Sequence, residues 1–159
     1  MISMTRLLCD AVGSGDHLRY GRRDAPKPVV VWNCTRQCNL RCIHCYASAD
    51  SQRSPEEMDT AAGRAFIRDL ADFGVPVILF SGGEPLLRKD LFLLAGLARE
   101  LGIRVALSTN GTLITAKVAK EIEKVGFAEV GISLDGIGAN NDYFRGQTGA
   151  FAAALAGIR

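Results

Sequence analysis

The sequence predicts an α/β fold built from successive strand–helix units, and two observations support this prediction. Four short apolar runs rich in β-branched residues alternate with four amphipathic stretches, as expected for strands buried on both faces and the helices that cover them. The strands recur about every 25–30 residues after a longer first unit, which fits parallel strands joined by right-handed crossovers. Such units can form either a barrel or an open doubly wound sheet.

The expected strands are Val29–Asn33, Val77–Phe80, Val105–Ser108 and Val130–Leu134. A complete eight-unit barrel needs about 250 residues, whereas this sequence has 159 residues and four units. We therefore expect a fragment of a larger domain. Residues 1–27 are interpreted as an N-terminal extension, and residues 28–159 as the N-terminal part of the core domain.

The first predicted helix has two possible starts. The stretch 54–57 reads Ser-Pro-Glu-Glu and has the form of a capping box, while Asp59 or Thr60 offers a second cap and would leave the first as a turn. Gly74 is expected to end the helix. Its predicted inner face consists of Phe66, Ile67, Leu70 and Phe73.

Three further helices are predicted from apolar residues at three- and four-residue spacing. One runs from near Asp90 to Leu101 and ends at Gly102, and the next runs from Thr115 to Gly126. The last begins near Gly149, and its apolar residues are Phe151, Leu155 and Ile158.

Composition and charge exclude several classes of protein. Apolar residues make up 48% of the chain, charged residues make up 23%, and the net charge is +2. Nothing therefore suggests a nucleic-acid partner or an acidic membrane surface. No apolar run approaches the roughly 20 residues that span a bilayer, and the first ten residues lack the apolar region of a signal peptide. We expect a cytoplasmic protein without a membrane span.

Four of the five cysteines lie within twelve residues, directly after the first predicted strand. An odd number of cysteines without an export signal favours metal binding over a disulfide framework. Cys38, Cys42 and Cys45 have the spacing C-x3-C-x2-C, and a short loop can point all three thiolates toward one iron–sulfur cluster. Three ligands on a four-iron cluster leave one iron open to a small molecule, so such a site can be catalytic.

Other metal centres remain possible on the sequence alone. Cys42 and Cys45 form one C-x2-C pair with His44 between them, and Cys34 could complete a closed zinc or electron-transfer site. The position of Cys34 at a strand end favours instead a small, half-buried apolar residue. Cys9 is isolated and carries no signal.

The cysteine segment resembles the signature of the radical S-adenosylmethionine (SAM) superfamily. Asn39-Leu40 follows the first cysteine, Tyr46-Ala47 follows the last, and residues 81–85 read Ser-Gly-Gly-Glu-Pro at the end of the second strand. The resemblance implies a partial (β/α)6 barrel of which this chain supplies the first four units. It also implies a [4Fe–4S] cluster on Cys38, Cys42 and Cys45, and SAM bound at the open iron.

The resemblance further implies contacts to SAM from four loops. The turn at residues 82–85 would hold the methionine amino group, and the loops that close the third and fourth strands would approach the ribose and the carboxylate. His44 would lie near the adenine and Arg145 near the SAM carboxylate, although an ordinary surface arginine is an equal alternative. The turn dipeptides Asn110-Gly111 and Asp135-Gly136 have a purely structural alternative as well. The implied SAM contacts are His44, Gly82, Gly83, Glu84, Pro85, Ser108, Asn110, Ser133, Asp135 and Arg145.

Within the superfamily, residues 18–22, 28–33 and 70–85 look like the siroheme-dependent haem biosynthesis branch, which includes didecarboxysiroheme deacetylases and radical SAM proteins of haem d1 synthesis. That resemblance implies reductive cleavage of SAM to a 5′-deoxyadenosyl radical and a tetrapyrrole substrate that loses acetate side chains. It also implies a low-potential electron donor of the ferredoxin or flavodoxin type. A peptide-modifying radical SAM maturase is the alternative. The sequence identifies no catalytic acid or base.

Overall fold

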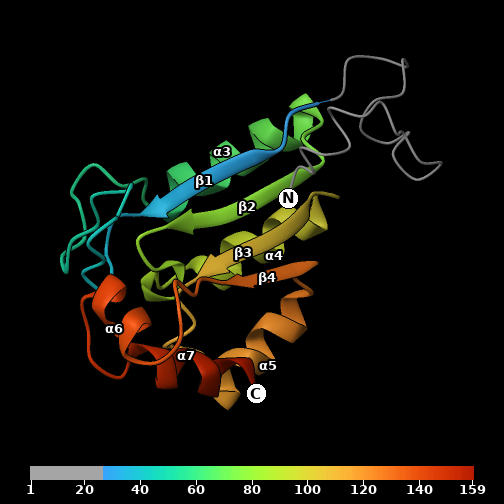
Figure 1. Ribbon diagram of the computed structural model, residues 1–159. Helices are drawn as coiled ribbons and strands as arrows, with labels where there is room; N and C mark the ends of the chain where they lie inside the picture. The colour runs from blue at the N-terminus through green and yellow to red at the C-terminus, as the bar shows by residue number, and fades with distance from the viewer. Residues whose placement is uncertain (1–26) are drawn as a thin grey trace, which may run out of the picture.

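Four parallel strands form a single sheet in the order β1-β2-β3-β4 (Figure 1). The computed structural model describes residues 27–159. The strands are β1 (Val30–Thr35), β2 (Val77–Gly82), β3 (Arg104–Thr109) and β4 (Glu129–Ile132). All four predicted strands are confirmed, although β4 ends two residues earlier than expected. The predicted extension falls almost entirely outside the described residues.

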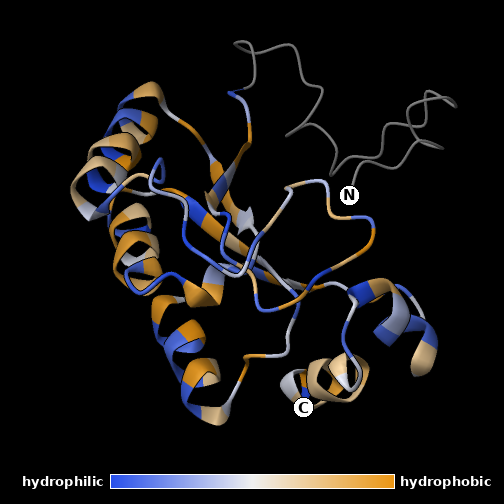
Figure 2. Ribbon diagram, turned by 90° about the vertical axis from the view of Figure 1, so that its left-hand side faces the viewer, coloured by the Kyte–Doolittle hydropathy of each residue, from blue (hydrophilic) through white to orange (hydrophobic). Residues whose placement is uncertain are grey.

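Three helices cover one face of the sheet, as Figure 2 shows from the side. They are α3 (Thr60–Phe73), α4 (Leu91–Glu100) and α5 (Ala116–Val125), and each connects two neighbouring strands. A short 3-10 turn, η1 (Pro85–Leu87), follows β2. Two more helices, α6 (Ala139–Arg145) and α7 (Ala150–Ile158), follow β4. The order confirms an α/β fold of four strand–helix units.

The main core lies between the sheet and these three helices. Ile78 and Phe80 of β2 and Val105 of β3 are fully buried, and they face residues of α3 and α4. Trp32 of β1 packs edge-on against Phe66 at 5.2 Å between ring centroids. Burying each large apolar side chain contributes about 1.5–3 kcal/mol, so this layer supplies most of the apolar stabilisation.

The second of the two predicted starts is the true start of α3. The Asp59 carboxylate accepts a hydrogen bond from the Ala62 N–H at 2.8 Å and caps the helix. The Ser54 N–H donates to the Glu57 carboxylate at 3.4 Å and the Glu56 N–H donates to the Ser54 hydroxyl at 3.3 Å, but these bonds enclose only a turn. The prediction that Phe73 faces inward was wrong, because Phe73 is 55% exposed and the Lys27 ammonium lies 4.1 Å from its ring centroid.

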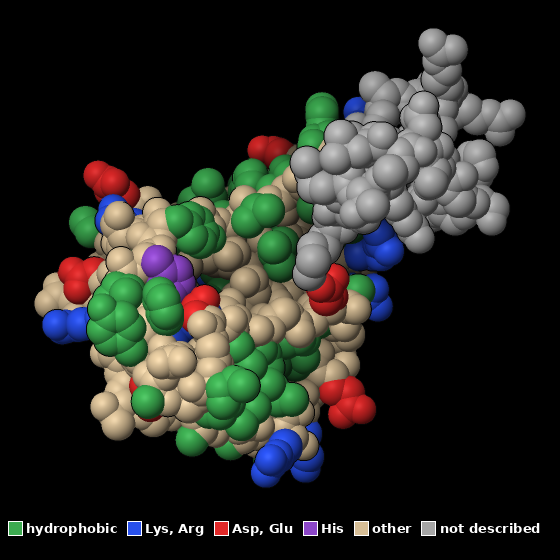
Figure 3. Space-filling model, viewed as in Figure 1, with side chains coloured by type: hydrophobic (Ala, Val, Ile, Leu, Met, Phe, Trp, Pro, Cys, Tyr) green, Lys and Arg blue, Asp and Glu red, His purple; other side chains and the backbone are tan. Residues whose placement is uncertain are grey.

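The opposite face of the sheet is not covered by any helix among residues 27–159. Figure 3 views this face and shows apolar side chains among the tan backbone and polar groups. Val31 of β1 is 56% exposed there. Within the described part of the chain, β1 pairs with β2 alone and β4 with β3 alone, so the sheet is open at both edges. An open sheet of four strands is the expected form of the first units of a barrel.

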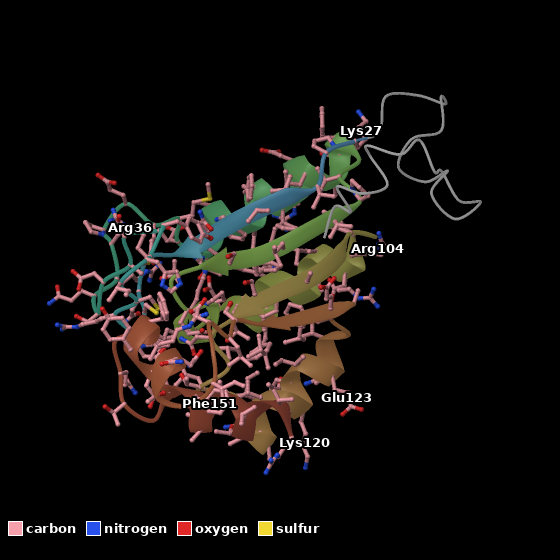
Figure 4. The ribbon with its side chains drawn as sticks, viewed as in Figure 1. Lys27, Arg36, Arg104, Lys120, Glu123 and Phe151 are labelled. Carbon is pink, nitrogen blue, oxygen red and sulfur yellow. The ribbon has the colours of Figure 1, made fainter. Side chains whose placement is uncertain are left out.

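The two ends of the sheet differ in character. Figure 4 places Arg36 where β1 leads into the long loop before α3, and it places Lys27 and Arg104 at the opposite end of the strands. The loop end carries the cysteines. No helix of residues 27–159 has the length and apolar content needed to cross a membrane.

Candidate functional site

A cavity of about 800 Å³ lies at the carboxyl ends of the strands, where the loops that follow them meet. Ligands bind at this end of the sheet in parallel α/β folds. Among the predicted cluster and SAM contacts, Glu84 and Pro85 do not line this cavity. The predicted residues that do line it are Cys38, Cys42, His44, Cys45, Gly82, Gly83, Ser108, Asn110, Ser133, Asp135 and Arg145.

Each of the three cysteine sulfurs accepts an N–H donor. The Leu40 backbone donates to Cys38 Sγ at 3.4 Å, and the Ala49 backbone donates to Cys45 Sγ at 3.4 Å. The guanidinium of Arg145 donates to Cys42 Sγ at 3.8 Å. Such donors stabilise negative charge on sulfur, so the loop suits three thiolates that face one cavity.

Cys38 is the most buried of the three, at 9% exposure. Burial raises the pKa of its thiol above the ordinary value, against the lowering effect of the Leu40 N–H. The thiol is therefore protonated at neutral pH until a metal replaces the proton.

The Glu57 carboxylate holds the cysteine loop to the end of β1. It accepts hydrogen bonds from the Arg36 backbone at 2.7 Å and from the Thr35 hydroxyl at 2.9 Å. The Arg53 Nε donates to the other carboxylate oxygen at 3.0 Å. Burial raises the pKa of Glu57, but these donors outweigh it and hold the pKa below its ordinary value. The loop is therefore held by an ionised side chain.

The far side of the cysteine loop is joined to the end of α6, which lies next to it in Figure 1. The Arg41 N–H donates to the Arg145 carbonyl at 3.2 Å, and the Ile43 N–H donates to the Phe144 carbonyl at 3.0 Å. Gly146 must be a glycine, because a Cβ there would collide with the Arg41 carbonyl. The cysteine loop is thus positioned by residues about one hundred positions later in the chain.

Sequence reasoning missed α6, whose seven residues lack an apolar stripe. Polar contacts hold it instead. Asn141 is 1% exposed and accepts a hydrogen bond from the Asp135 N–H at 2.9 Å. Asp142 accepts from the Gly149 and Phe151 N–H groups, at 2.6 and 2.8 Å, and so organises the start of α7.

Arg145, Asp135 and His44 form a polar group on the cavity wall. Asp135 Oδ2 lies 2.7 Å from Arg145 Nε and 3.3 Å from His44 Nε2. The buried Arg145 Nε lacks the alignment of a hydrogen bond, so this contact is electrostatic. The His44 ring packs edge-on against Phe144, with 5.7 Å between ring centroids. The structure thus brings together three predicted residues, one from the cysteine loop, one from the loop after β4 and one from the end of α6.

The Gly-Gly turn passes close to the start of the cysteine loop. The Gly83 N–H donates to the Thr35 carbonyl, and the Glu84 N–H donates to the Gln37 carbonyl, both at 2.8 Å. A Cβ on Gly82 would collide with the Thr35 carbonyl, and a Cβ on Gly83 with the Gln37 carbonyl. The two glycines are therefore required by a close approach of two backbone segments, in addition to any role toward a ligand.

The Glu84 side chain points away from the cavity and is fully buried. Its carboxylate accepts hydrogen bonds from the Asn110 N–H at 2.8 Å, the Thr109 hydroxyl at 2.8 Å and the Leu86 N–H at 3.0 Å. Burial raises the pKa of Glu84, and these three donors oppose that rise. Pro85, the first residue of η1, is also buried.

Cys34 belongs to the main core and does not line the cavity. It is 2% exposed, and burial raises the pKa of its thiol to about 12. The closed four-cysteine alternative therefore lacks its fourth ligand. Among residues 27–159, no three His, Cys, Asp or Glu side chains gather closely enough to hold a single metal ion. Cys9 lies outside the described residues.

Tyr46 was not singled out as a site residue, yet it lines the cavity directly after the last cysteine. Its hydroxyl lies 3.2 Å from both Asn33 Oδ1 and Ser81 Oγ. Asn33 and Ser81 are paired across β1 and β2, so the Tyr46 hydroxyl lies over the face of the sheet that no described helix covers. The place of Tyr46 next to a predicted cluster ligand is the signal that could have found it.

Curated relatives of this chain include two from the haem branch. The Fe-coproporphyrin III synthase of Methanosarcina barkeri is 54% identical over 99% of this chain and 43% of its own length. The pre-heme d1 synthase of Dinoroseobacter shibae is 53% identical over 86% of this chain and 34% of its own length. The mycofactocin maturase of Mycobacterium tuberculosis is less similar, at 37% identity over 86% of this chain and 34% of its own length. This chain thus spans less than half the length of these relatives.

A solved structure and a family model agree with the sequence relatives. The structure of native anSMEcpe with bound AdoMet has a TM-score of 0.68 and 26% identity, and covers 82% of this chain and 39% of its own. The model of the radical SAM superfamily matches residues 32–159. That superfamily uses a [4Fe–4S] cluster and SAM. Together with the cavity and its three cysteines, these matches show that the chain belongs to the radical SAM superfamily.

Proposed function

We propose that the protein carrying this chain is a radical SAM enzyme that cleaves SAM reductively and acts on a siroheme-derived tetrapyrrole. The radical SAM chemistry is supported above all by the residues on the wall of the cavity. Three cysteines from one short loop face it, each sulfur accepts an N–H donor, and the fourth nearby cysteine is buried elsewhere. This donor set fits a four-iron cluster with one iron left open.

The residues of this chain hold and orient the two cofactors. Cys38, Cys42 and Cys45 are the proposed cluster ligands, and their N–H donors stabilise the negative charge that collects on the sulfurs. The chemistry that the cluster and SAM supply when bound is reductive cleavage of the SAM C5′–S bond into methionine and a 5′-deoxyadenosyl radical, which takes a hydrogen atom from the substrate.

The remaining walls of the cavity offer groups that match the parts of SAM. The backbone at Gly82 and Gly83 can approach the methionine amino group closely. The Ser108 and Ser133 hydroxyls and the Asp135 carboxylate can bind ribose hydroxyls. Arg145 is proposed to pair with the SAM carboxylate, and His44, 47% exposed in its side chain, to lie beside the adenine.

The proposed substrate is supported by the relatives rather than by the cavity. Two of the most similar curated relatives are named as an Fe-coproporphyrin III synthase and a pre-heme d1 synthase. We infer an iron tetrapyrrole whose acetate side chains are removed, with a ferredoxin or flavodoxin type of protein as electron donor. A maturase function has less support, because the mycofactocin maturase is less similar.

Cluster binding is tested by anaerobic reconstitution of the full-length protein with iron and sulfide. We expect the wild type to hold about four more iron atoms per chain than a variant with Cys38, Cys42 and Cys45 all replaced by Ala. Cys34→Ala is the matched control and should keep this iron. A triple variant with as much iron as the wild type, or a wild type with one zinc here, would refute the cluster.

Substrate and reaction are tested with didecarboxysiroheme, SAM and dithionite. We expect one 5′-deoxyadenosine and one methionine for each hydrogen atom abstracted, with a mass loss in the tetrapyrrole equal to its acetate groups. SAM cleavage without any change in the tetrapyrrole would disprove the substrate assignment and leave the radical chemistry standing.

A further inference from the structure

A closed ring of three polar side chains lies behind Cys38. The Asn110 amide nitrogen donates to Asn39 Oδ1 at 2.9 Å, and the Asn39 amide nitrogen donates to the Thr112 hydroxyl at 2.9 Å. The Thr112 hydroxyl closes the ring by donating to Asn110 Oδ1 at 2.7 Å. Asn39 directly follows the first cysteine, so the ring joins the cysteine loop to the loop after β3.

The ring leaves no free hydrogen-bonding capacity on the Asn110 side chain. Its carbonyl oxygen accepts from both the hydroxyl and the backbone N–H of Thr112, at 2.7 and 2.9 Å. Its amide nitrogen donates to Asn39 and also points at Cys38 Sγ, 4.0 Å away. An amide has two donor hydrogens and two acceptor lone pairs. Asn110 could bind a ribose only by breaking the ring or by giving up its contact with Cys38 Sγ.

Glu84 holds the loop after β3, which carries Asn110, in place. Its carboxylate holds the Asn110 backbone and the Thr109 hydroxyl, and Thr109 Oγ1 in turn accepts from the Gly111 N–H at 3.0 Å. Neither Glu84 nor Asn39 nor Thr112 lines the cavity. A continuous series of hydrogen bonds therefore runs from the Gly-Gly-Glu-Pro turn, through Asn110 on the cavity wall, to the sulfur of Cys38.

We propose that Glu84, Asn110, Asn39 and Thr112 are positioning residues that act on Cys38, and that the Glu84 and Asn110 side chains do not bind SAM. This proposal rests on the proposed function, because it assumes that Cys38 holds a cluster. The ring fixes the first ligand of the loop and aims an amide N–H at its sulfur. Donors to cluster sulfurs raise the reduction potential, so the ring affects both retention of the cluster and its potential.

The first test replaces Thr112 in the reconstituted full-length protein. Thr112→Val removes the hydroxyl that closes the ring and keeps the shape of the side chain, while Thr112→Ser keeps the hydroxyl. For Thr112→Val we expect iron release to a chelator to accelerate about fivefold, the ratio that corresponds to one net hydrogen bond, and the reduction potential to become more negative. Thr112→Ser should restore both values. Thr148→Val, at an exposed position outside the ring, is the matched control.

A second variant keeps the test decisive if Thr112→Val does not fold. Asn39→Ala opens the ring from the cysteine loop and should produce the same acceleration and the same shift in potential. Wild-type iron release and wild-type potential in either folded variant would overturn the proposal.

Asn110→Ala separates the proposal from direct SAM binding. On our proposal, this variant releases iron faster, and the double variant Asn110→Ala/Thr112→Val is no worse than the more affected single variant, because both changes open the same ring. If Asn110 instead binds SAM, Asn110→Ala weakens SAM binding while iron release stays at the wild-type rate. If the wild type holds no four-iron cluster, the proposed function itself is rejected. If the wild type holds the cluster and the variants release iron at the wild-type rate, only the positioning role is rejected.

Discussion

The helix-covered side of the sheet and the loop end of the sheet are stabilised by different means. Between the sheet and α3, α4 and α5, the buried residues are almost all apolar. At the loop end, buried polar groups dominate, and Thr35, Glu84, Asn110 and Asn141 are all 7% exposed or less. The first region depends on volume and shape, whereas the second depends on complete hydrogen bonding. Substitutions in the core should therefore lower the stability of the fold, whereas substitutions at the loop end should mainly change the geometry of the site.

The largest expected effect on stability comes from the core. Phe80→Ala removes a fully buried ring that packs against Trp32 and Phe127. We expect the free energy of unfolding to fall by about 3–5 kcal/mol, measured by denaturant titration. Below the unfolding transition, SAM affinity should stay close to the wild-type value. A weaker affinity at a temperature where the variant is fully folded would show that core and site are coupled.

Glu57→Gln should produce the opposite pattern, with a smaller loss of stability and a larger effect on the loop. The amide loses charge-assisted bonds to Arg36 and Arg53, which costs about 1–2 kcal/mol at neutral pH. Faster iron release from the reconstituted protein is expected, because the cysteine loop is less firmly held. The measurements are denaturant titration and release to a chelator.

The same variant should change the dependence of stability on pH. The pKa of Glu57 is lower in the folded chain than its ordinary value, so the ionised carboxylate stabilises the fold above the ordinary pKa of about 4.3. That stabilisation is lost as the pH falls through the lower, folded-state pKa. Unfolding free energies measured from pH 6 down to about pH 3 should therefore fall more steeply for the wild type than for Glu57→Gln. Parallel curves would contradict this role of Glu57.

The smallest effect is expected for Arg53→Ala. The Arg53 side chain is 55% exposed, and its ion pair with Glu57 at 3.0 Å is of the i,i+4 kind. The Glu57 side chain is 7% exposed, but the exposed Arg53 can be solvated, so we expect the pair to contribute no more than about 1 kcal/mol. Raising the salt concentration should reduce the difference from the wild type. A loss of unfolding free energy above about 1 kcal/mol would mean that Glu57 needs Arg53 to hold the cysteine loop to the end of β1.

The sequence was informative where apolar periodicity determines structure. The strands and the helices α3, α4 and α5 follow from it, because each has an apolar face that must be buried. Phe73 was misplaced because it is the last residue of α3, where its ring lies outside the core and meets the Lys27 side chain. Helix α6 was missed because polar contacts of Asn141 and Asp142 hold it, and no periodic pattern reports such contacts.

The residues of the site could be predicted, but the orientation of their side chains could not. The spacing of the cysteines and the loops after the strands identified about half of the residues that line the cavity. The same pattern could not show that the Glu84 carboxylate faces Asn110 instead of the cavity. Nor could it separate Cys34 as a ligand from Cys34 as a core residue, since burial at 2% exposure is a property of the folded chain.

The backbone bonds between the cysteine loop and the end of α6 also set an order of events during synthesis. Arg41 and Ile43 find their partners only at Phe144 and Arg145. A chain made from its N-terminus therefore carries the three cysteines well before the segment that closes their loop has been translated. The three thiols that we propose as cluster ligands are made early, and the loop that carries them is among the last parts of this chain to close.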